Sequence, residues 1–121
     1  MKEKKSTHLH TGAAGEALAA DYLLAEGFTI LERNWRYGRR EVDIIAEKQG
    51  VLHFIEVKTR RSNRYGRPED QVDGRKMELL AEAAAEYLHR HPQWQRIQFD
   101  ILSITLGGSG TEYFFIEDVS R

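Results

Sequence analysis

The sequence predicts an α/β fold in which a mixed sheet of about five strands is flanked by helices, in the order α-β-β-β-α-β-β. Two long segments place apolar residues three or four positions apart, and several shorter segments have strand patterning. With 121 residues, 40% of them hydrophobic and 31% charged, the chain can fill one core but not two. We therefore expect a flexible arm over residues 1–10 and a single domain over residues 11–121.

Both helical segments carry start and stop signals. The first is expected over residues 11–26, because Thr11 can cap its N-terminus and Gly27 can end it. The second is expected to begin at Pro68, since proline suits the first turn of a helix, and to stop before Pro92. Its apolar residues form a face broad enough to lie on a sheet.

The remaining segments are bounded by turn residues, as strands are. A hairpin turn is expected at Gln49-Gly50, and the glycine-rich stretch 107–110 is expected to join the last two strands. Side chains alternate across a sheet, so Glu56 and Lys58 share one face of the central strand. The expected strands are residues 28–36, 40–46, 51–59, 97–105 and 112–118.

Acidic residues end the apolar patterning of two neighbouring strands. If Asp43 and Glu56 point to the same side, their oxygens can converge on one cation of the Mg²⁺ or Mn²⁺ type. Lys58 could then stabilise charge on a phosphoryl group. Spacing alone leaves two alternatives open: an exposed cross-strand ion pair, worth under about 1 kcal/mol, and a glycosidase-like carboxylate pair.

Positive charge is concentrated in the middle of the chain. Residues 33–76 hold 12 of the 18 Lys and Arg residues but 7 of the 19 acidic ones. This distribution suits either a polyanion-binding surface or simple decoration of loops and strand edges. Candidate phosphate contacts are Arg40, Arg60, Arg61, Arg64, Arg67 and Lys76.

Composition also excludes several classes of protein. The chain has no cysteine, which rules out disulfides and thiolate metal sites. It has no apolar run of about 18 residues that could cross a bilayer, and its polar N-terminus does not resemble a secretory signal. We expect a cytoplasmic protein that does not use a membrane.

Four other residues have more than one interpretation. Trp35 and Tyr37 could stack on an unpaired base, although core packing suits Trp35 better. His53 is expected to be a packed core residue. Asp100 could lie near the acidic pair, but an edge charge is the favoured interpretation.

The stretch Glu41-Val-Asp-Ile-Ile-Ala46 followed by Phe54-Ile-Glu-Val-Lys-Thr-Arg60 resembles the core of the PD-(D/E)xK nuclease superfamily. Over about residues 11–118 the chain also resembles the bacterial YraN / UPF0102 family, which is related to archaeal Holliday-junction resolvases. This resemblance implies a restriction-endonuclease-like fold. Supporting residues outside the core include Gly12 to Glu16, Gly27-Phe28, Asn34, Gly66, Lys76, Tyr87-Leu88 and Phe99-Asp100.

The resemblance assigns roles to residues by position. Asp43, Glu56 and the carbonyl of Val57 would be metal ligands, Lys58 the catalytic lysine, and Glu16 the helix glutamate that completes the site. The cofactor would be Mg²⁺ or Mn²⁺.

The resemblance also bears on the substrate. Arg40 departs from the family pattern, since a glycine commonly precedes the segment that begins at Glu41. The implied function is a metal-dependent endonuclease that hydrolyses phosphodiester bonds, with DNA rather than RNA as partner and branched or distorted DNA as one substrate. A symmetric homodimer is compatible with that function. The alternative is a non-catalytic nucleic-acid-binding or adaptor module that retains the nuclease fold.

Overall fold

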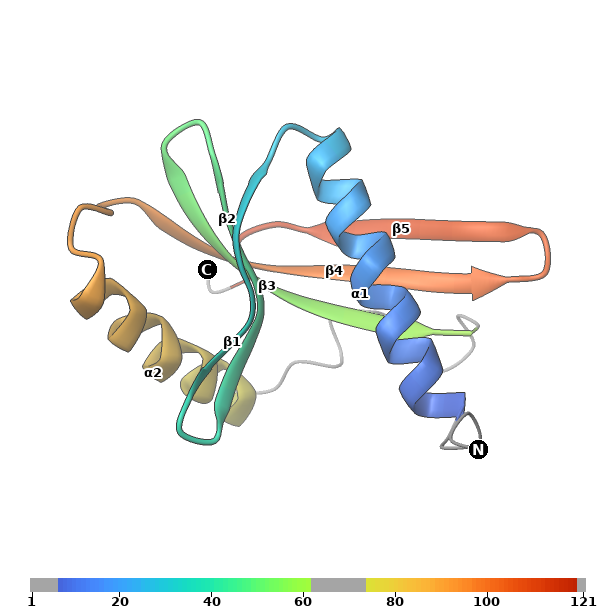
Figure 1. Cartoon of the computed structure of the whole chain (residues 1–121), viewed down its shortest axis with the longest axis horizontal. Coiled ribbons are helices and arrows are strands. Elements are labelled where there is room, and N and C mark those ends of the chain that lie inside the picture. The colour runs from blue at the N-terminus through green and yellow to red at the C-terminus, as the bar shows by residue number, and fades with distance from the viewer. Residues whose placement is uncertain (1–6, 62–73, 120–121) are drawn as a thin grey trace.

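The computed structural model describes residues 7–61 and 74–119. It confirms the predicted α/β fold and the order α-β-β-β-α-β-β (Figure 1). The elements are α1 (Thr7–Ala25), β1 (Thr29–Tyr37), β2 (Arg40–Lys48), β3 (Val51–Arg60), α2 (Gly74–Arg90), β4 (Ile97–Gly107) and β5 (Gly110–Ile116).

The five strands form one mixed sheet in the order β1-β2-β3-β4-β5. Strands β3 and β4 are parallel, as expected for a crossover connection that contains a helix, and the other neighbouring pairs are antiparallel. The sheet twists so strongly that the β1–β2 hairpin crosses the direction of the other three strands (Figure 1). This divergence opens a fork between β2 and β3.

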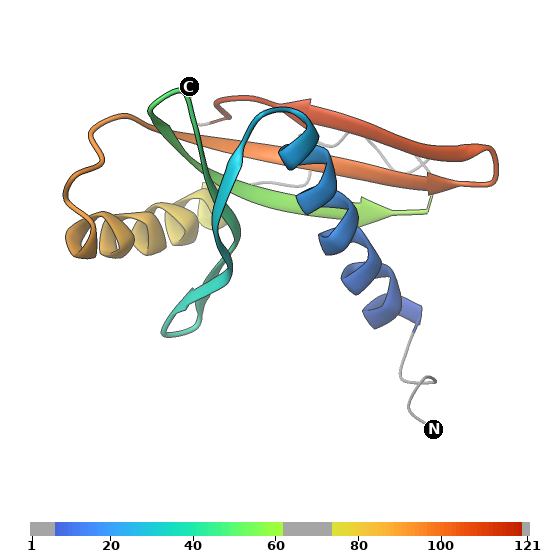
Figure 2. The same cartoon turned by 45° about the horizontal axis from the view of Figure 1, so that its top comes forward.

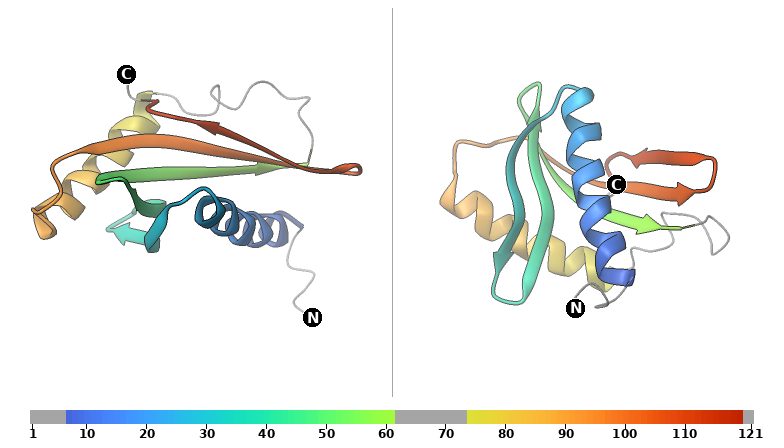
Figure 3. Two further views of the ribbon diagram at one scale, coloured as in Figure 1. Left: turned by 90° about the horizontal axis from the view of Figure 1, so that it is seen from above. Right: turned by 45° about the vertical axis from the view of Figure 1, so that its right-hand side comes forward.

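Each helix covers a different set of strand residues, and so the sheet has a core on both faces. Residues of α1 pack with Ile44 and Ile55, whereas residues of α2 pack with Ile45 and Phe54. Neighbours in a strand point to opposite faces, which places the two helices on opposite sides of β2 and β3. Figure 2 shows the β1–β2 hairpin between the helices, and the right-hand view of Figure 3 shows α2 passing behind that hairpin and α1 passing in front of β3 and β4.

Helix α1 approaches β3 unusually closely at Gly15. A Cβ atom on Gly15 would lie 2.0 Å from Oγ1 of Thr59, which is far inside van der Waals contact. A larger residue fits at this position only if the Thr59 side chain turns away and the helix or the strand also shifts slightly. The next residue, Glu16, lies close enough to the fork between β2 and β3 for its charge to act on Asp43.

Two element boundaries differ from the sequence predictions, and a third prediction is not tested. Helix α1 begins at Thr7, inside the part expected to be a flexible arm. Strand β5 begins at Gly110 rather than at residue 112, because Gly107 pairs with Gly110 and the glycine-rich stretch contracts to a two-residue turn. The predicted helix start at Pro68 lies outside the described residues.

Within residues 7–61 and 74–119, neither helix is long and apolar enough to span a bilayer.

Candidate functional site

The candidate site forms at the fork where β2 and β3 separate. Their regular pairing runs from Lys48–Val51 to Ile44–Ile55 and stops there. Asp43 is the next residue of β2, and its Oδ2 accepts a hydrogen bond from the backbone N–H of Val57 at 2.8 Å. The carboxylate thus replaces a backbone partner that β2 no longer supplies to β3.

The backbone of β2 is irregular at the same point. Val42 packs on the α2 side of the sheet, whereas Ile44, two residues later, packs on the α1 side. Residues two apart in a regular strand would share a face. The change of face occurs across Asp43, and it directs this side chain into the fork rather than onto either core.

Glu56 reaches the same place from β3. Asp43 and Glu56 line one cavity of about 270 Å³, together with Arg40 of β2 and Leu79 and Leu80 of α2. Lys58 lies on the same face of β3 as Glu56, and its Nζ is 3.3 Å from Glu56 Oε2. The structure therefore brings together the three side chains that the sequence places on two adjacent strands.

Burial and electrostatic repulsion both raise the pKa of Asp43. Burial, as the larger cause, and the nearby charge of Glu56 raise the pKa of Asp43 from 3.8 to about 7. Weaker repulsion from Glu41 and Glu16 acts in the same direction, and the hydrogen bond from Val57 opposes it. Without a compensating cation, the ionised carboxylates destabilise one another, so the site is electrostatically suited to a proton or a metal ion.

Glu16 approaches the fork from α1, and its side chain accepts a hydrogen bond from Asn34. With the Asn34 amide oriented to satisfy both neighbours, its nitrogen donates to Glu16 Oε2 at 3.2 Å and to Glu41 Oε2 at 3.1 Å. Asn34 has a φ of +54°, a left-handed conformation that asparagine tolerates better than most residues. The flanking pairs Arg33–Ile44 and Trp35–Val42 place Asn34 across from Asp43.

This bridging role of Asn34 was not predicted from the sequence. Asparagine within a strand of otherwise large or charged residues is the only local signal, and it indicates a bulge or turn as readily as a functional site.

The carboxylates do not surround a ready-made metal cage. In the part of the chain that the structure describes, no three His, Cys, Asp or Glu side chains are arranged to hold one ion. Asp43 and Glu56 fit the way Mg²⁺ is usually held, by one or two carboxylates with water and substrate oxygens completing the shell. Val57, whose carbonyl the resemblance assigns as a ligand, also fixes Asp43 through its amide.

Of the predicted phosphate contacts, the structure describes three side chains. Arg40 lines the cavity but forms an ion pair with Glu82 of α2 at 2.5 Å, and its buried Nε has no hydrogen-bond partner among the described residues. Arg60 ends β3, and Arg61 follows it as an exposed residue. Arg64, Arg67 and the side chain of Lys76 lie outside the described part.

The two aromatic candidates for stacking on a base, Trp35 and Tyr37, differ in burial, as the sequence suggested. Trp35 is half-buried against the α2 side of the sheet, with its ring perpendicular to that of Tyr87 at 5.2 Å between centroids. Core packing therefore accounts for Trp35. Tyr37, at the end of β1, is 38% exposed and remains open to a ligand.

The expectation that Asp100 is an edge charge is wrong. Its strand, β4, lies between β3 and β5, and Asp100 is 0% exposed. One oxygen lies 2.6 Å from Nδ1 of His53, and the other accepts from Gln98 Nε2 at 2.9 Å and from the backbone N–H of Asp118 at 2.8 Å. His53 is buried, as predicted, but as a partner of this carboxylate rather than in a purely apolar setting.

Comparison with known proteins identifies the family of the chain. The model of the uncharacterised protein family UPF0102 matches residues 15–104, a range that contains every residue of the candidate site. A UPF0102 protein of Flavobacterium johnsoniae is 41% identical over 117 residues, which are 93% of each chain. Relatives from Syntrophomonas wolfei and Chlorobaculum parvum are 49% and 46% identical over 77% and 79% of this chain, and over 82% and 75% of their own. The chain belongs to the UPF0102 family.

Proposed function

We propose that this protein is a metal-dependent endonuclease that hydrolyses phosphodiester bonds in DNA, with Asp43 and Glu56 as the metal ligands. The observation that carries the proposal is the sharing of one cavity by these two carboxylates, at a point where the pKa of Asp43 is raised to about 7. A divalent cation relieves that repulsion and is the natural occupant for two carboxylates beside a lysine. Mg²⁺ or Mn²⁺ would be the cofactor.

In this proposal the remaining roles at the site belong to residues of the chain itself. A bound Mg²⁺ or Mn²⁺ would lower the pKa of a water molecule and offset charge on the reacting phosphate. Val57 N–H fixes one oxygen of Asp43, which leaves the other free to face the cavity. Lys58, next to Glu56, supplies a fixed positive charge beside the scissile phosphate. Glu16, anchored by Asn34, is positioned to hold or orient water at the edge of the site.

The substrate follows from charge and access. Arg39 and Arg40 line the cavity beside the acidic pair, and an arginine fork matches a phosphate oxygen pair. A DNA duplex with a branch or another distortion would expose one DNA strand to this cavity, which lies between strands β2 and β3 and helix α2. A symmetric dimer would present two such sites to two DNA strands.

A non-catalytic nucleic-acid-binding module is the second candidate. The observation that favours it is the lack of a three-ligand metal group among the described residues. The two functions differ in what Mn²⁺ does: it supports cleavage in the first and is dispensable in the second.

A cleavage panel separates the two candidates. Single-stranded, nicked, flapped and four-way DNA are incubated with the protein and Mn²⁺, and products are resolved on denaturing gels. We expect at least one substrate to be cut, with the rate reduced about a hundredfold or more by Glu56→Gln or Lys58→Ala. Glu112→Gln, an exposed carboxylate change on β5, is the matched control and should cut at the wild-type rate.

The result against the nuclease hypothesis is equally definite. If no DNA is cut in Mn²⁺ while salt-sensitive DNA binding persists, the protein is a binding module.

A further inference from the structure

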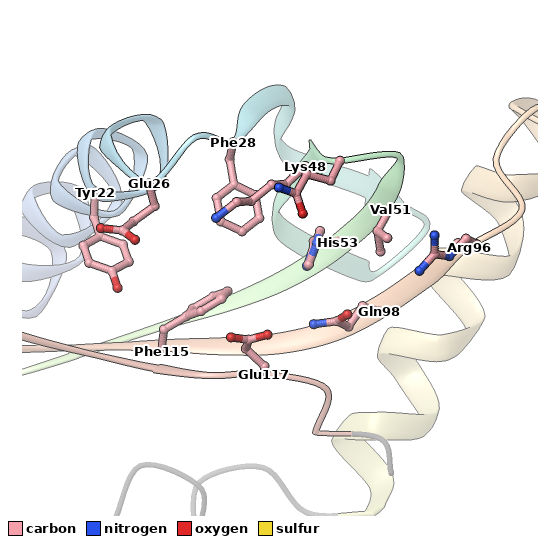
Figure 4. Close-up of a pocket in the computed structure, with 11 residues that line it drawn as sticks. Tyr22, Glu26, Phe28, Lys48, Val51, His53, Arg96, Gln98, Phe115 and Glu117 are labelled. Atoms are coloured by element: carbon pink, nitrogen blue, oxygen red, sulfur yellow. The ribbon is translucent and has the colours of Figure 1, made fainter.

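A second and larger cavity lies at the other end of the sheet from the acidic pair. Its volume is about 570 Å³, within the range of small-molecule binding sites. The walls come from the end of α1, the hairpin between β2 and β3, the start of β4 and the end of β5 (Figure 4). None of its lining residues lines the cavity that contains Asp43 and Glu56.

A buried histidine presents one free nitrogen to this cavity. His53 lines the cavity but is only 7% exposed, and its Nδ1 is bound to Asp100. A carboxylate oxygen accepts, as the other oxygen of Asp100 does from Gln98 and Asp118, so Nδ1 acts as the donor in this contact. In the neutral imidazole this leaves Nε2 as an acceptor, and no other described residue bonds to it. Figure 4 shows the His53 ring between Lys48 and Gln98.

Charged side chains of both signs line the same space without pairing with each other. Lys48 and Arg96 are the cations, and Glu26 and Glu117 are the carboxylates. In the described part of the chain, Lys48 contacts the Phe28 ring, with Nζ 5.1 Å from the centroid, and none of the four forms an ion pair. Ligand groups can therefore satisfy them: an anion for the cations, and hydroxyl or amino donors for the carboxylates.

Aromatic rings complete the walls on the side of α1 and β5. Phe28 stands edge-on to the His53 ring at 4.9 Å and to Phe115 at 5.9 Å, and Phe115 in turn packs against Tyr22 at 6.4 Å. Phe28 is buried, so the partly exposed ring of Phe115, backed by Phe28, provides the apolar surface for a planar heterocycle. The cavity thus offers ring surface, an acceptor nitrogen, two cations and two carboxylates together.

We propose that this cavity is a nucleotide-binding site, separate from the acidic pair. Its ligand is a nucleotide whose base packs against Phe115, whose phosphate meets Lys48 and Arg96, and whose sugar hydroxyls or base amino group donate to the carboxylates. His53 Nε2 accepts one further hydrogen bond from the ligand. The nucleotide can be a free mononucleotide or the unpaired terminal nucleotide of a strand, since both carry the same groups.

The test uses the full chain and isothermal titration calorimetry in EDTA, so that metal binding at the acidic pair does not contribute. The ligands are the ribo- and deoxyribonucleoside monophosphates, with inorganic phosphate as the reference. We expect at least one nucleotide to bind more tightly than phosphate. Its affinity should fall about tenfold in Lys48→Ala and in Arg96→Ala, the loss expected for one charge-assisted contact. Arg33→Ala, an exposed arginine on β1 outside both cavities, should leave the affinity within about twofold.

A further variant tests the histidine, and two DNA molecules test the source of the nucleotide. His53→Asn keeps a donor toward Asp100 but removes the acceptor at the position of Nε2, so it should also weaken nucleotide binding about tenfold. If it does not fold, the two surface variants still decide the question. If linear single-stranded DNA competes with the mononucleotide for the site and circular single-stranded DNA does not, the site binds strand ends. If mononucleotides bind and linear DNA does not compete, the site binds free nucleotides.

Two results would overturn the proposal. One is the failure of every mononucleotide and of linear DNA to bind with an affinity that depends on Lys48 and Arg96. The other is tight binding that Asp43→Asn abolishes, because the ligand would then occupy the acidic site. Wild-type cleavage of DNA has no bearing on either result, so the two proposals succeed or fail independently.

Discussion

Replacing Asp43 by asparagine should stabilise the metal-free protein, and more so at high pH. Burial and Glu56 raise the pKa of Asp43 from 3.8 to about 7. The folded carboxyl therefore keeps its proton over a pH range in which the unfolded one has lost it, and the folded state loses stability as the pH rises through that range. Above the folded pKa the loss is complete, at about 4 kcal/mol by the conversion of 1.36 kcal/mol per pKa unit.

Asparagine removes this penalty and retains the useful contact. Its side-chain oxygen can still accept the hydrogen bond from Val57 N–H, now without a second carboxylate beside Glu56. The advantage of Asp43→Asn over the wild type should grow by about 2 to 3 kcal/mol between pH 5 and pH 8.

Urea unfolding in EDTA at several pH values measures this difference, with Glu112→Gln as the control that removes an exposed carboxylate. Glu56→Gln should give part of the same effect, because it removes the second-largest cause of the raised pKa of Asp43. If Asp43→Asn is no more stable than the wild type at pH 8, burial and repulsion at the fork are not what the structure indicates.

Three other changes test separate parts of the fold and site. Gly15→Ala should lower the free energy of unfolding by about 1 to 3 kcal/mol, since the added methyl group meets strand β3; unchanged urea midpoints would contradict this. Asp100→Ala should destabilise the protein by about 3 kcal/mol or more by leaving His53 and two further donors without their acceptor, as measured by urea unfolding at pH 7. Glu82→Gln should release Arg40 and tighten DNA binding at low salt about threefold, with a steeper salt dependence; equal affinities would mean that Arg40 does not contact phosphate.

The meeting of Asp43 and Glu56 could be predicted because a short turn fixes the register of their strands. Gln49 and Gly50 have φ values of +53° and +83°, the left-handed pair typical of a two-residue hairpin turn. With Lys48 opposite Val51, each step back along β2 matches one step forward along β3, which puts residue 43 across from residue 56. Local sequence thus determines this part of the site.

The sequence predictions are wrong or incomplete where the contacting residues are distant in sequence. Asp100 is buried because β4 inserts between β3 and β5, an arrangement that a charged residue in a strand does not reveal. The Arg40–Glu82 pair and the Asn34 bridge depend on how α2 and α1 pack against the β1–β2 hairpin. No periodicity or motif within a single segment encodes such contacts.

A calorimetric titration of Mn²⁺ into the pure protein at pH 8 tests the metal centre most directly. At this pH Asp43 is ionised in the folded state, so proton release does not mask the binding. The wild type and Glu112→Gln should bind Mn²⁺ at millimolar concentration or below, and Asp43→Asn and Glu56→Gln should not. The absence of Mn²⁺ binding to the wild type, or its persistence in both fork variants, would contradict the assignment of these two carboxylates as metal ligands.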